Sequence, residues 1–67
     1  MEHRCYFYVV VIYSDNTKFG FDVILQGESQ EILADIHMIT RGVLMASSAK
    51  YAYAYKGDGT QACGFRR

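Results

Sequence analysis

Two apolar segments in the first half of the chain differ in how their hydrophobic positions are arranged. Residues 6–13 are apolar at every position, whereas residues 18–26 alternate, with one set of positions held by Phe19, Phe21, Val23 and Leu25. Because successive side chains of a strand point to opposite faces, the alternating segment predicts a strand whose core face is formed by those residues. The segment that is apolar throughout predicts a strand covered on both sides. Residues 14–17 favour turns, so the two segments should form a β-hairpin.

The middle of the chain has the hydrophobic spacing of an amphipathic helix. Ser29 is a candidate N-cap, and Glu28 and Glu31 lie where the helix dipole favours negative charge. Apolar side chains then recur at helical spacing and predict one buried stripe, made of Ile32, Leu33, Ile36, Ile39, Val43 and Leu44. We expect this stripe to pack on the core face of the sheet.

The second half of this helix holds a glycine and two methionines. Gly42 would either lie inside the helix or end it just after Arg41, and we expect the helix to continue to about Ala46. Methionine is flexible and apolar and typically fills irregular gaps in a core. We therefore assign Met38 and Met45 to the core.

The last third of the chain alternates tyrosine with alanine and then turns back. Residues 50–56 have the period of a strand, residues 57–60 contain an Asp-Gly pair that fits a tight hairpin, and residues 61–65 predict a short returning strand. Residues 1–67 are therefore expected to form a single α+β domain of the ββαββ type. Its three- or four-stranded antiparallel sheet would have one helix packed on one face.

One helix can cover only one face of such a sheet, which leaves bulky apolar side chains without a cover. If the alanines of residues 50–56 face the helix, the open face carries Tyr6, Tyr8, Tyr51, Tyr53 and Tyr55. The opposite orientation, with the tyrosines of that strand inside, is the alternative. Exposed apolar patches usually mark contact sites, and tyrosine is enriched in protein interfaces. We expect this face to bind a partner protein or to form a homodimer, rather than only to shield the sheet.

The charges cancel overall but not along the chain. Seven basic and seven acidic side chains give a net charge of zero, which argues against a general nucleic-acid binder. Residues 1–40 hold six acidic and two basic side chains (net −4), and residues 41–67 hold one acidic and five basic ones (net +4). On the predicted helix, Glu28, Glu31 and Asp35 form one acidic stripe. This stripe is either a solvated face or a surface that docks on a basic groove of a partner protein.

The chain lacks the residue patterns of common catalytic and metal sites. Asp35 and His37 project from diverging helix positions, no serine lies in a Gly-x-Ser-x-Gly turn, and no glycine-rich segment has the spacing of a phosphate loop. His3, Cys5, His37 and Cys63 lack the spacing of zinc ligands. We therefore expect a protein without enzymatic activity, cofactor or metal.

The apolar segment near the N-terminus also bears on location. It is too short to cross a membrane and is followed by polar residues rather than a small-residue cleavage site. A cytoplasmic protein without membrane contact is therefore expected. Cys5 and Cys63 would be reduced thiols there, and one disulfide in a secreted protein is the alternative.

A second function class rests on basic residues near the tyrosine strand. Lys50 and Lys56 flank the tyrosines, and Arg66 and Arg67 follow shortly after. Aromatic side chains on a sheet, flanked by cations, can stack the bases of single strands. Single-stranded nucleic-acid binding by these residues is the alternative to protein binding.

In its size, its single helix on one sheet, its acidic helix face and its lack of catalytic residues, the chain resembles small accessory proteins encoded by phages and prophages. Anti-CRISPR inhibitors are the best-known members of that group. The resemblance covers the architecture of the whole chain and no shared motif. It implies a stoichiometric inhibitor that acts in the host cytoplasm. Such a protein would block a host protein or defence complex sterically or by mimicking nucleic acid.

Overall fold

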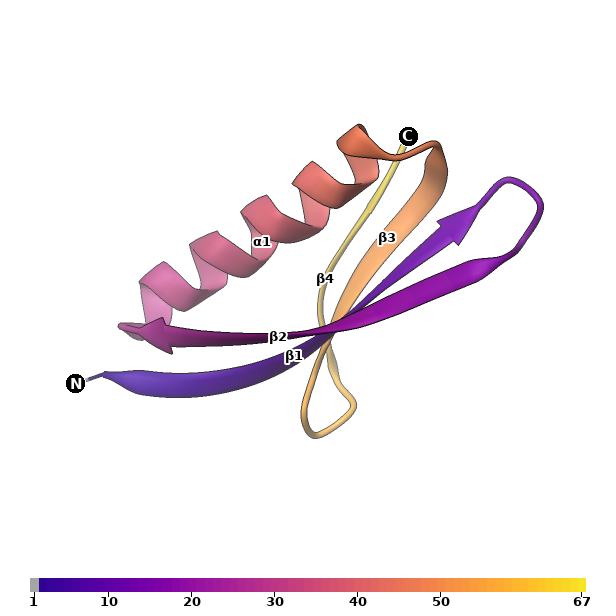
Figure 1. The fold of residues 1–67 in the computed structure, drawn as a ribbon. Coiled ribbons are helices and arrows are strands. Elements are labelled where there is room, and N and C mark those ends of the chain that lie inside the picture. Colours follow the sequence, from indigo (N-terminus) through magenta and orange to yellow (C-terminus); the bar gives the residue numbers. More distant parts are fainter. Residues whose placement is uncertain (1) are drawn as a thin grey trace.

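The computed structural model describes residues 2–67, which form one four-stranded antiparallel sheet with one helix against it (Figure 1). In chain order the elements are β1 (His3–Tyr13), β2 (Lys18–Gly27), α1 (Ser29–Ala46), β3 (Ala49–Lys56) and β4 (Gln61–Arg66). Their order across the sheet is β2-β1-β3-β4, so β1 and β3 are the central strands. The predicted ββαββ arrangement is confirmed, with four strands, and so is the continuation of the helix through Gly42 to Ala46.

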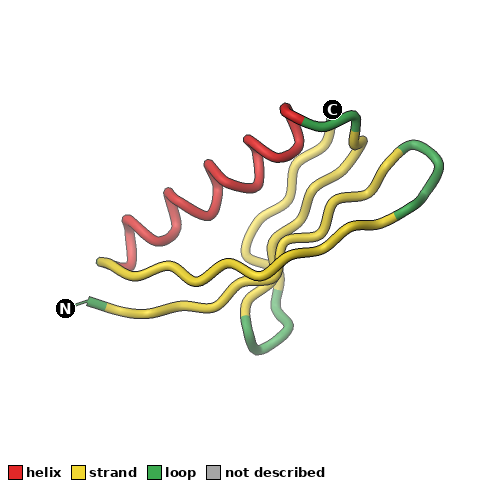
Figure 2. Tube along the Cα trace, viewed as in Figure 1, coloured by secondary structure: helices red, strands yellow, loops and turns green. Residues whose placement is uncertain are grey.

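The two hairpin turns, which project from different ends of the sheet (Figure 2), are built alike. In the first, Asp15 accepts hydrogen bonds from the backbone N–H and the hydroxyl of Thr17, at 3.0 and 2.6 Å. In the second, Asp58 accepts the same two bonds from Thr60, at 2.9 and 2.6 Å. These bonds, led by the one from the threonine hydroxyl, hold the pKa of both carboxyl groups below the usual 3.8.

The core lies between α1 and one face of the sheet, where small side chains let the helix come close. On the central strands, Val9, Ala52 and Ala54 are fully buried. The helix contributes buried residues at intervals of four, namely Ile32, Ile36, Thr40 and Leu44. The Thr40 hydroxyl donates a 2.7 Å hydrogen bond to the carbonyl oxygen of Ile36, so its burial leaves no polar group unsatisfied.

The buried stripe of the helix is narrower than its sequence predicts. Assignment of Met38 and Met45 to the core is wrong, because their side chains are 71% and 64% exposed, and Leu33 is 47% exposed. The helix rests on the sheet along the line of residues four apart, and side chains beside that line turn toward solvent. The N-cap is Glu28 rather than Ser29, which is already the first helical residue, and the Glu28 side chain makes no capping hydrogen bond.

The buried part of β2 is also shorter than its sequence predicts. Phe19 is 58% exposed, although Phe21 in the same set packs against the core. The helix crosses the sheet diagonally (Figure 1), so that Ile32 packs in a cluster with Phe7 and Val9 of β1, and Leu44 packs in a cluster with Ala49 and Ala52 of β3. The end of β2 next to the first hairpin turn is therefore left without cover.

Candidate binding face of the sheet

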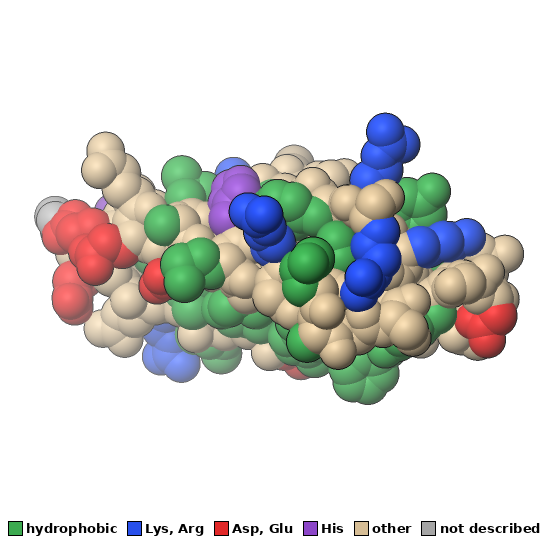
Figure 3. Space-filling view, turned by 90° about the horizontal axis from the view of Figure 1, so that it is seen from above, with side chains coloured by type: hydrophobic (Ala, Val, Ile, Leu, Met, Phe, Trp, Pro, Cys, Tyr) green, Lys and Arg blue, Asp and Glu red, His purple; other side chains and the backbone are tan. Residues whose placement is uncertain are grey.

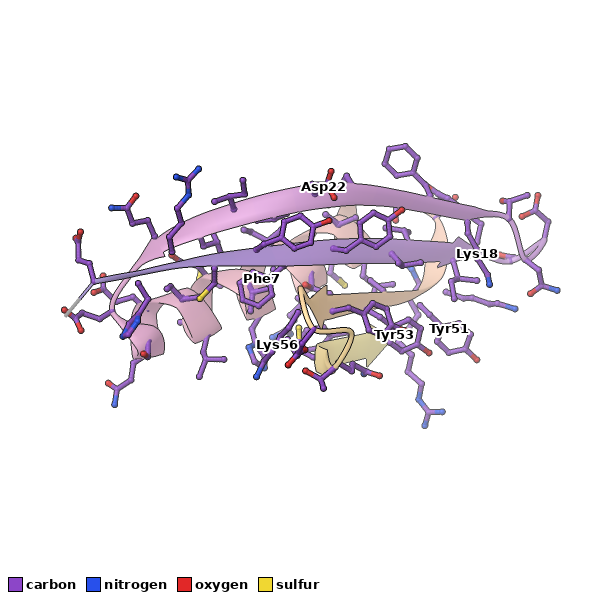
Figure 4. All side chains as sticks on the ribbon, turned by 90° about the horizontal axis from the view of Figure 1, so that it is seen from below. Phe7, Lys18, Asp22, Tyr51, Tyr53 and Lys56 are labelled. Carbon is purple, nitrogen blue, oxygen red and sulfur yellow. The ribbon has the colours of Figure 1, made fainter. Side chains whose placement is uncertain are left out.

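The face of the sheet that points away from α1 is built from alternate residues of the strands, and we call it the open face. Its large side chains are Tyr6, Tyr8, Val10 and Ile12 of β1, Ile24 of β2, and Tyr51, Tyr53 and Tyr55 of β3. Figure 4 looks onto this face, with Asp22, Tyr51 and Tyr53 labelled. No element within residues 2–67 lies over it, so within the described chain β1 is covered on one side only, as expected of a sheet with one helix. The tyrosines of β3 point outward, which is the orientation that the alanines favour.

The tyrosine rings of β3 form a row along the strand. The ring centroids of Tyr51 and Tyr53 are 6.1 Å apart with the planes inclined by 18°, and those of Tyr53 and Tyr55 are 6.5 Å apart at 42°. The Lys50 ammonium lies 5.5 Å from the centroid of the Tyr51 ring. Tyr55 pairs across the strands with Tyr8, so the row continues onto β1. The result is a connected aromatic surface over both central strands.

Two of these rings lie across a neighbouring strand, because that strand has a glycine beneath them. A Cβ atom on Gly20 of β2 would collide with the Tyr8 hydroxyl group. A Cβ atom on Gly64 of β4 would come within 2.7 Å of the Tyr53 ring. The glycines therefore give the rings room to lie against the backbone, with their outer sides toward solvent.

A hydrogen bond between β1 and β2 fixes a third tyrosine. The Tyr6 hydroxyl donates to a carboxylate oxygen of Asp22 at 2.6 Å. Because this bond holds the phenolic proton, it raises the pKa of Tyr6 above the usual 10.0. Tyr6 is directly opposite Ile24 in the register, so its ring leans along β2 to reach Asp22. The open face thus has an ordered polar contact among its apolar residues.

The basic residues predicted to contact nucleic acid do not gather on one surface. The Lys50 ammonium donates a 2.9 Å hydrogen bond to Asn16 in the first hairpin turn. Lys56 is exposed at the start of the second turn, at the other end of β3. Arg66 pairs with Tyr51 and so lies on the open face. Of these three side chains, only Arg66 therefore lies beside the tyrosine row without a described hydrogen-bond partner.

Arg67 is turned toward the helix and satisfies the carbonyl groups at its C-terminal end. Its Nε atom donates to the carbonyl oxygen of Ala49 at 2.7 Å, and Nη2 donates to that of Leu44 at 2.7 Å and to that of Ser47. The last turn of α1 contains no basic residue. The Arg67 guanidinium therefore supplies the positive charge that a helix C-terminus favours. This contact joins distant parts of the chain, so no local pattern reveals it.

The acidic stripe lies on the side of the molecule opposite the tyrosines. Glu28, Glu31 and Asp35 are all exposed at the N-terminal end of α1. Figure 3, which looks onto the helix side, shows most of the visible acidic side chains gathered at one end and most of the visible lysines and arginines over the other half. Because the sheet separates this stripe from the open face, the two surfaces cannot contact the same flat partner surface. They are separate candidate sites.

Side chains that could perform chemistry are dispersed. Cys5 and Cys63 are free thiols, and the Cys63 sulfur lies 3.6 Å from the Thr40 hydroxyl oxygen. The His37 ring is held by its own helix, where Nδ1 lies 2.7 Å from the carbonyl oxygen of Leu33. Within residues 2–67, no three histidine, cysteine or acidic side chains come together as ligands of a metal ion would.

The amino-acid sequence does not predict a groove that lies at one end of the sheet. It has a volume of about 460 Å³ and lies between β1, the first turn of α1 and the turn between β3 and β4. Cys5 and Phe7 line it from the sheet, and Ile32 and Leu33 line it from the helix. It depends on where β3 ends relative to β1, which is a property of strand pairing and not of local sequence.

Comparison with known proteins identifies no relative. No family model, curated protein or solved structure matches the chain. The resemblance to phage-encoded inhibitors therefore stays a prediction. In the part of the chain that the structure describes, no helix is long and apolar enough to cross a membrane.

Proposed function

We propose that this chain is a non-catalytic protein-binding module, which docks through the open face and blocks the surface it covers. The row formed by Tyr51, Tyr53 and Tyr55, together with Tyr6 and Tyr8, supports this proposal most. Tyrosine offers a large and rigid contact area with a polar rim, which is why it is enriched at interfaces. The steric mode of action follows the resemblance to small phage-encoded inhibitors.

The distribution of charge on the open face fits a protein partner. Charged residues are depleted in the centre of protein interfaces and tolerated at the rim. Lys18 and Arg66 lie at strand ends on this face, and the carboxylate of Asp22 accepts the hydrogen bond from Tyr6. The centre is left to aromatic and aliphatic side chains. A second copy of the chain would meet the same chemistry and is the competing occupant.

Single-stranded nucleic acid is the second candidate ligand, and the orientation of two rings favours it. Tyr8 and Tyr53 lie across glycines of the neighbouring strands, so ring surface is turned outward as base stacking requires. Lys18 and Arg66 at the rim would contact phosphate groups. The zero net charge and the diversion of Arg67 to the helix end count against this candidate.

A pair of double variants tests the proposal. Tyr8→Ser with Tyr53→Ser removes two rings from the open face, whereas Glu31→Lys with Asp35→Lys reverses the charge of the helix stripe. A partner captured from bacterial lysate would be identified, purified and titrated by calorimetry against each variant. We expect one-to-one binding by the wild type and the stripe variant, and binding at least about tenfold weaker by the tyrosine variant. Equal binding by the tyrosine variant would contradict docking through the open face.

One control variant and two further measurements distinguish the three possible ligands of the open face. Met38→Ser changes a side chain on the helix that is 71% exposed and should leave partner binding unchanged. Salt-dependent binding of a labelled single strand, lost in the tyrosine variant, would replace the protein partner by nucleic acid. A concentration-dependent dimer in sedimentation, lost in the same variant, would make a second copy the occupant.

A further inference from the structure

The central strands are unequal in length, and this leaves part of β1 without a neighbour on one side. β2 pairs with β1 from His3 onward, but β3 ends at Lys56, which is opposite Phe7. The residues His3–Tyr6, which we call the edge segment, therefore have β2 on one side and no strand of the described chain on the other. Figure 4 shows Lys56 close to Phe7, where β3 leaves the sheet.

The hydrogen-bonding groups of the edge segment can be assigned from the register. Alternate residues of an antiparallel strand bond to opposite neighbours. The backbone N–H of Tyr13 bonds to the carbonyl oxygen of Thr17 at 2.9 Å, on the side of β2, and the pairing of β1 with β2 is regular throughout. Odd-numbered residues of β1 therefore bond to β2, and even-numbered residues face β3. Beyond the end of β3, Arg4 and Tyr6 consequently direct their backbone N–H and C=O groups away from β2. Continuing the register of Phe7 with Lys56 by one residue places Gly57 of the turn opposite Tyr6, so Arg4 is the residue of β1 whose groups face the free edge.

The apolar groove lies directly beside these groups, in the space that a longer β3 would occupy. Cys5 and Phe7 form its floor on the sheet, and Ile32 and Leu33 form its wall on the helix. Leu33 is 47% exposed and is the wall residue that the core leaves to solvent. Strand-directed hydrogen-bonding groups and an apolar groove are thus combined at one place. The outer edges of β2 and β4 are also free, but they do not border this groove.

We propose that the edge segment binds an extended segment of a partner protein, which adds to the sheet as a short strand in line with β3. In strand addition, backbone hydrogen bonds supply affinity and pockets for alternate side chains supply specificity. Side chains of the added strand on the groove side would be apolar and would cover Leu33. On the other side, the exposed Arg4 would pair best with an acidic residue directly opposite. The ligand is therefore an extended peptide in which apolar residues alternate with an acidic one.

This site is distinct from the tyrosine row. It uses the edge of β1, the side chain of Arg4 and the helix side of the sheet, whereas Tyr51 and Tyr53 lie toward the other end of β1 on the open face. The inference therefore stands whether or not the open face binds a partner. A chain with both sites would hold one protein across its open face and a peptide segment at the end of the sheet.

The test uses a fluorescein-labelled peptide with the sequence Gly-Val-Glu-Val-Thr-Val-Gly and a scrambled peptide, Gly-Val-Val-Val-Glu-Thr-Gly, which has the same composition without the alternation. Binding would be followed by fluorescence anisotropy, and amide hydrogen exchange would be followed by nuclear magnetic resonance. We expect the amide of Arg4 to exchange quickly in the free protein and at least about tenfold more slowly with the alternating peptide. The scrambled peptide should leave its exchange unchanged.

Two charge-introducing variants place the peptide in the groove. Leu33→Lys puts an ammonium group on the groove wall and should weaken binding at least about tenfold. Met45→Lys introduces the same charge on the same helix at a side chain 64% exposed and far from the groove, and it should bind like the wild type. Both positions are exposed, so both variants should fold.

Three results would overturn the proposal. The first is no protection of the Arg4 amide at peptide concentrations up to about 1 mM, where even weak strand addition becomes visible. The second is equal binding by Leu33→Lys and the wild type. The third is protection of the same amide without peptide, growing with protein concentration alongside a dimer in sedimentation, because the occupant would then be a second copy.

Discussion

The two faces of the central strands carry the same backbone but opposite kinds of side chain. On β1, Val9 is fully buried under the helix, whereas Tyr8, its neighbour in sequence, is 40% exposed on the open face. On β3, Ala52 and Ala54 are fully buried and Tyr53 between them is half-buried. On β3, side-chain size is therefore limited where α1 approaches and is large where nothing covers the sheet. A single strand can meet both demands because its side chains alternate between the faces.

The difference also shows how a thin domain protects its backbone. The described molecule measures 42 × 20 × 14 Å. Its one helix covers one face of the sheet, so no second layer covers the other face. The rings of Tyr8 and Tyr53 lie over Gly20 and Gly64 and take part of that role themselves. The open face is therefore partly a structural covering and partly a surface available for contact. Measurements of stability and of binding can tell these two roles apart.

The largest expected difference in stability is between alanine variants of two isoleucines, one on each side of the sheet. Ile36→Ala removes a fully buried side chain and should lower the free energy of unfolding by about 2–5 kcal/mol. Ile24→Ala removes the same atoms from a side chain that is 57% exposed on the open face, and the loss should stay below about 1 kcal/mol. Urea unfolding of both variants gives the comparison. Equal losses would mean that the open face is covered in solution.

A smaller difference is expected between the adjacent arginines at the end of the chain. Arg67 donates to carbonyl oxygens at the C-terminal end of α1, so Arg67→Ala should cost about 1–2 kcal/mol of stability. Arg66 lies on the open face, and Arg66→Ala should change stability by less than about 0.5 kcal/mol. Thermal or urea unfolding measures both. If Arg66→Ala proved the more destabilising, the assignment of the two side chains to opposite faces would be wrong.

Local patterns were sufficient to predict the elements, and they gave the outward orientation of the tyrosines as one of two alternatives. The helix end at Ala46 and the outward tyrosines follow from periodicity and from the small size of alanine. The exposure of Met38 and Phe19 does not follow, because it depends on the diagonal course of the helix across the sheet. The sequence pattern around a hydrophobic residue beside the predicted stripe is the same whether its side chain is buried against the sheet or exposed.

The candidate sites also differ in whether the sequence predicts them. The aromatic row was predictable, because residues two apart on one strand share a face. The groove was not, because it requires that β3 end at Lys56 while β1 extends to His3, and only the pairing of distant strands determines that. The role of Arg67 was hidden for the same reason, since its partner carbonyls belong to another element. Sites formed by unequal strand lengths or by chain ends thus need the three-dimensional structure.

The smallest expected effect concerns the hydrogen bond from Tyr6 to Asp22 on the open face. The bond requires the phenolic proton and raises the pKa of Tyr6 in the folded state above 10.0. Its contribution to stability is therefore present below the unfolded pKa and is lost as the pH rises through the raised pKa of Tyr6. The difference between the absorbance titrations of the wild type and of Tyr6→Phe isolates this residue from the other tyrosines. We expect Asp22→Asn to bring the pKa of Tyr6 back toward 10.0, because the amide carries no charge and is a weaker acceptor. A Tyr6 titration that Asp22→Asn leaves unchanged would mean that the ring is not held against β2. Binding at the open face would then require the tyrosines to be ordered by the partner, at a cost in affinity that a preformed face avoids.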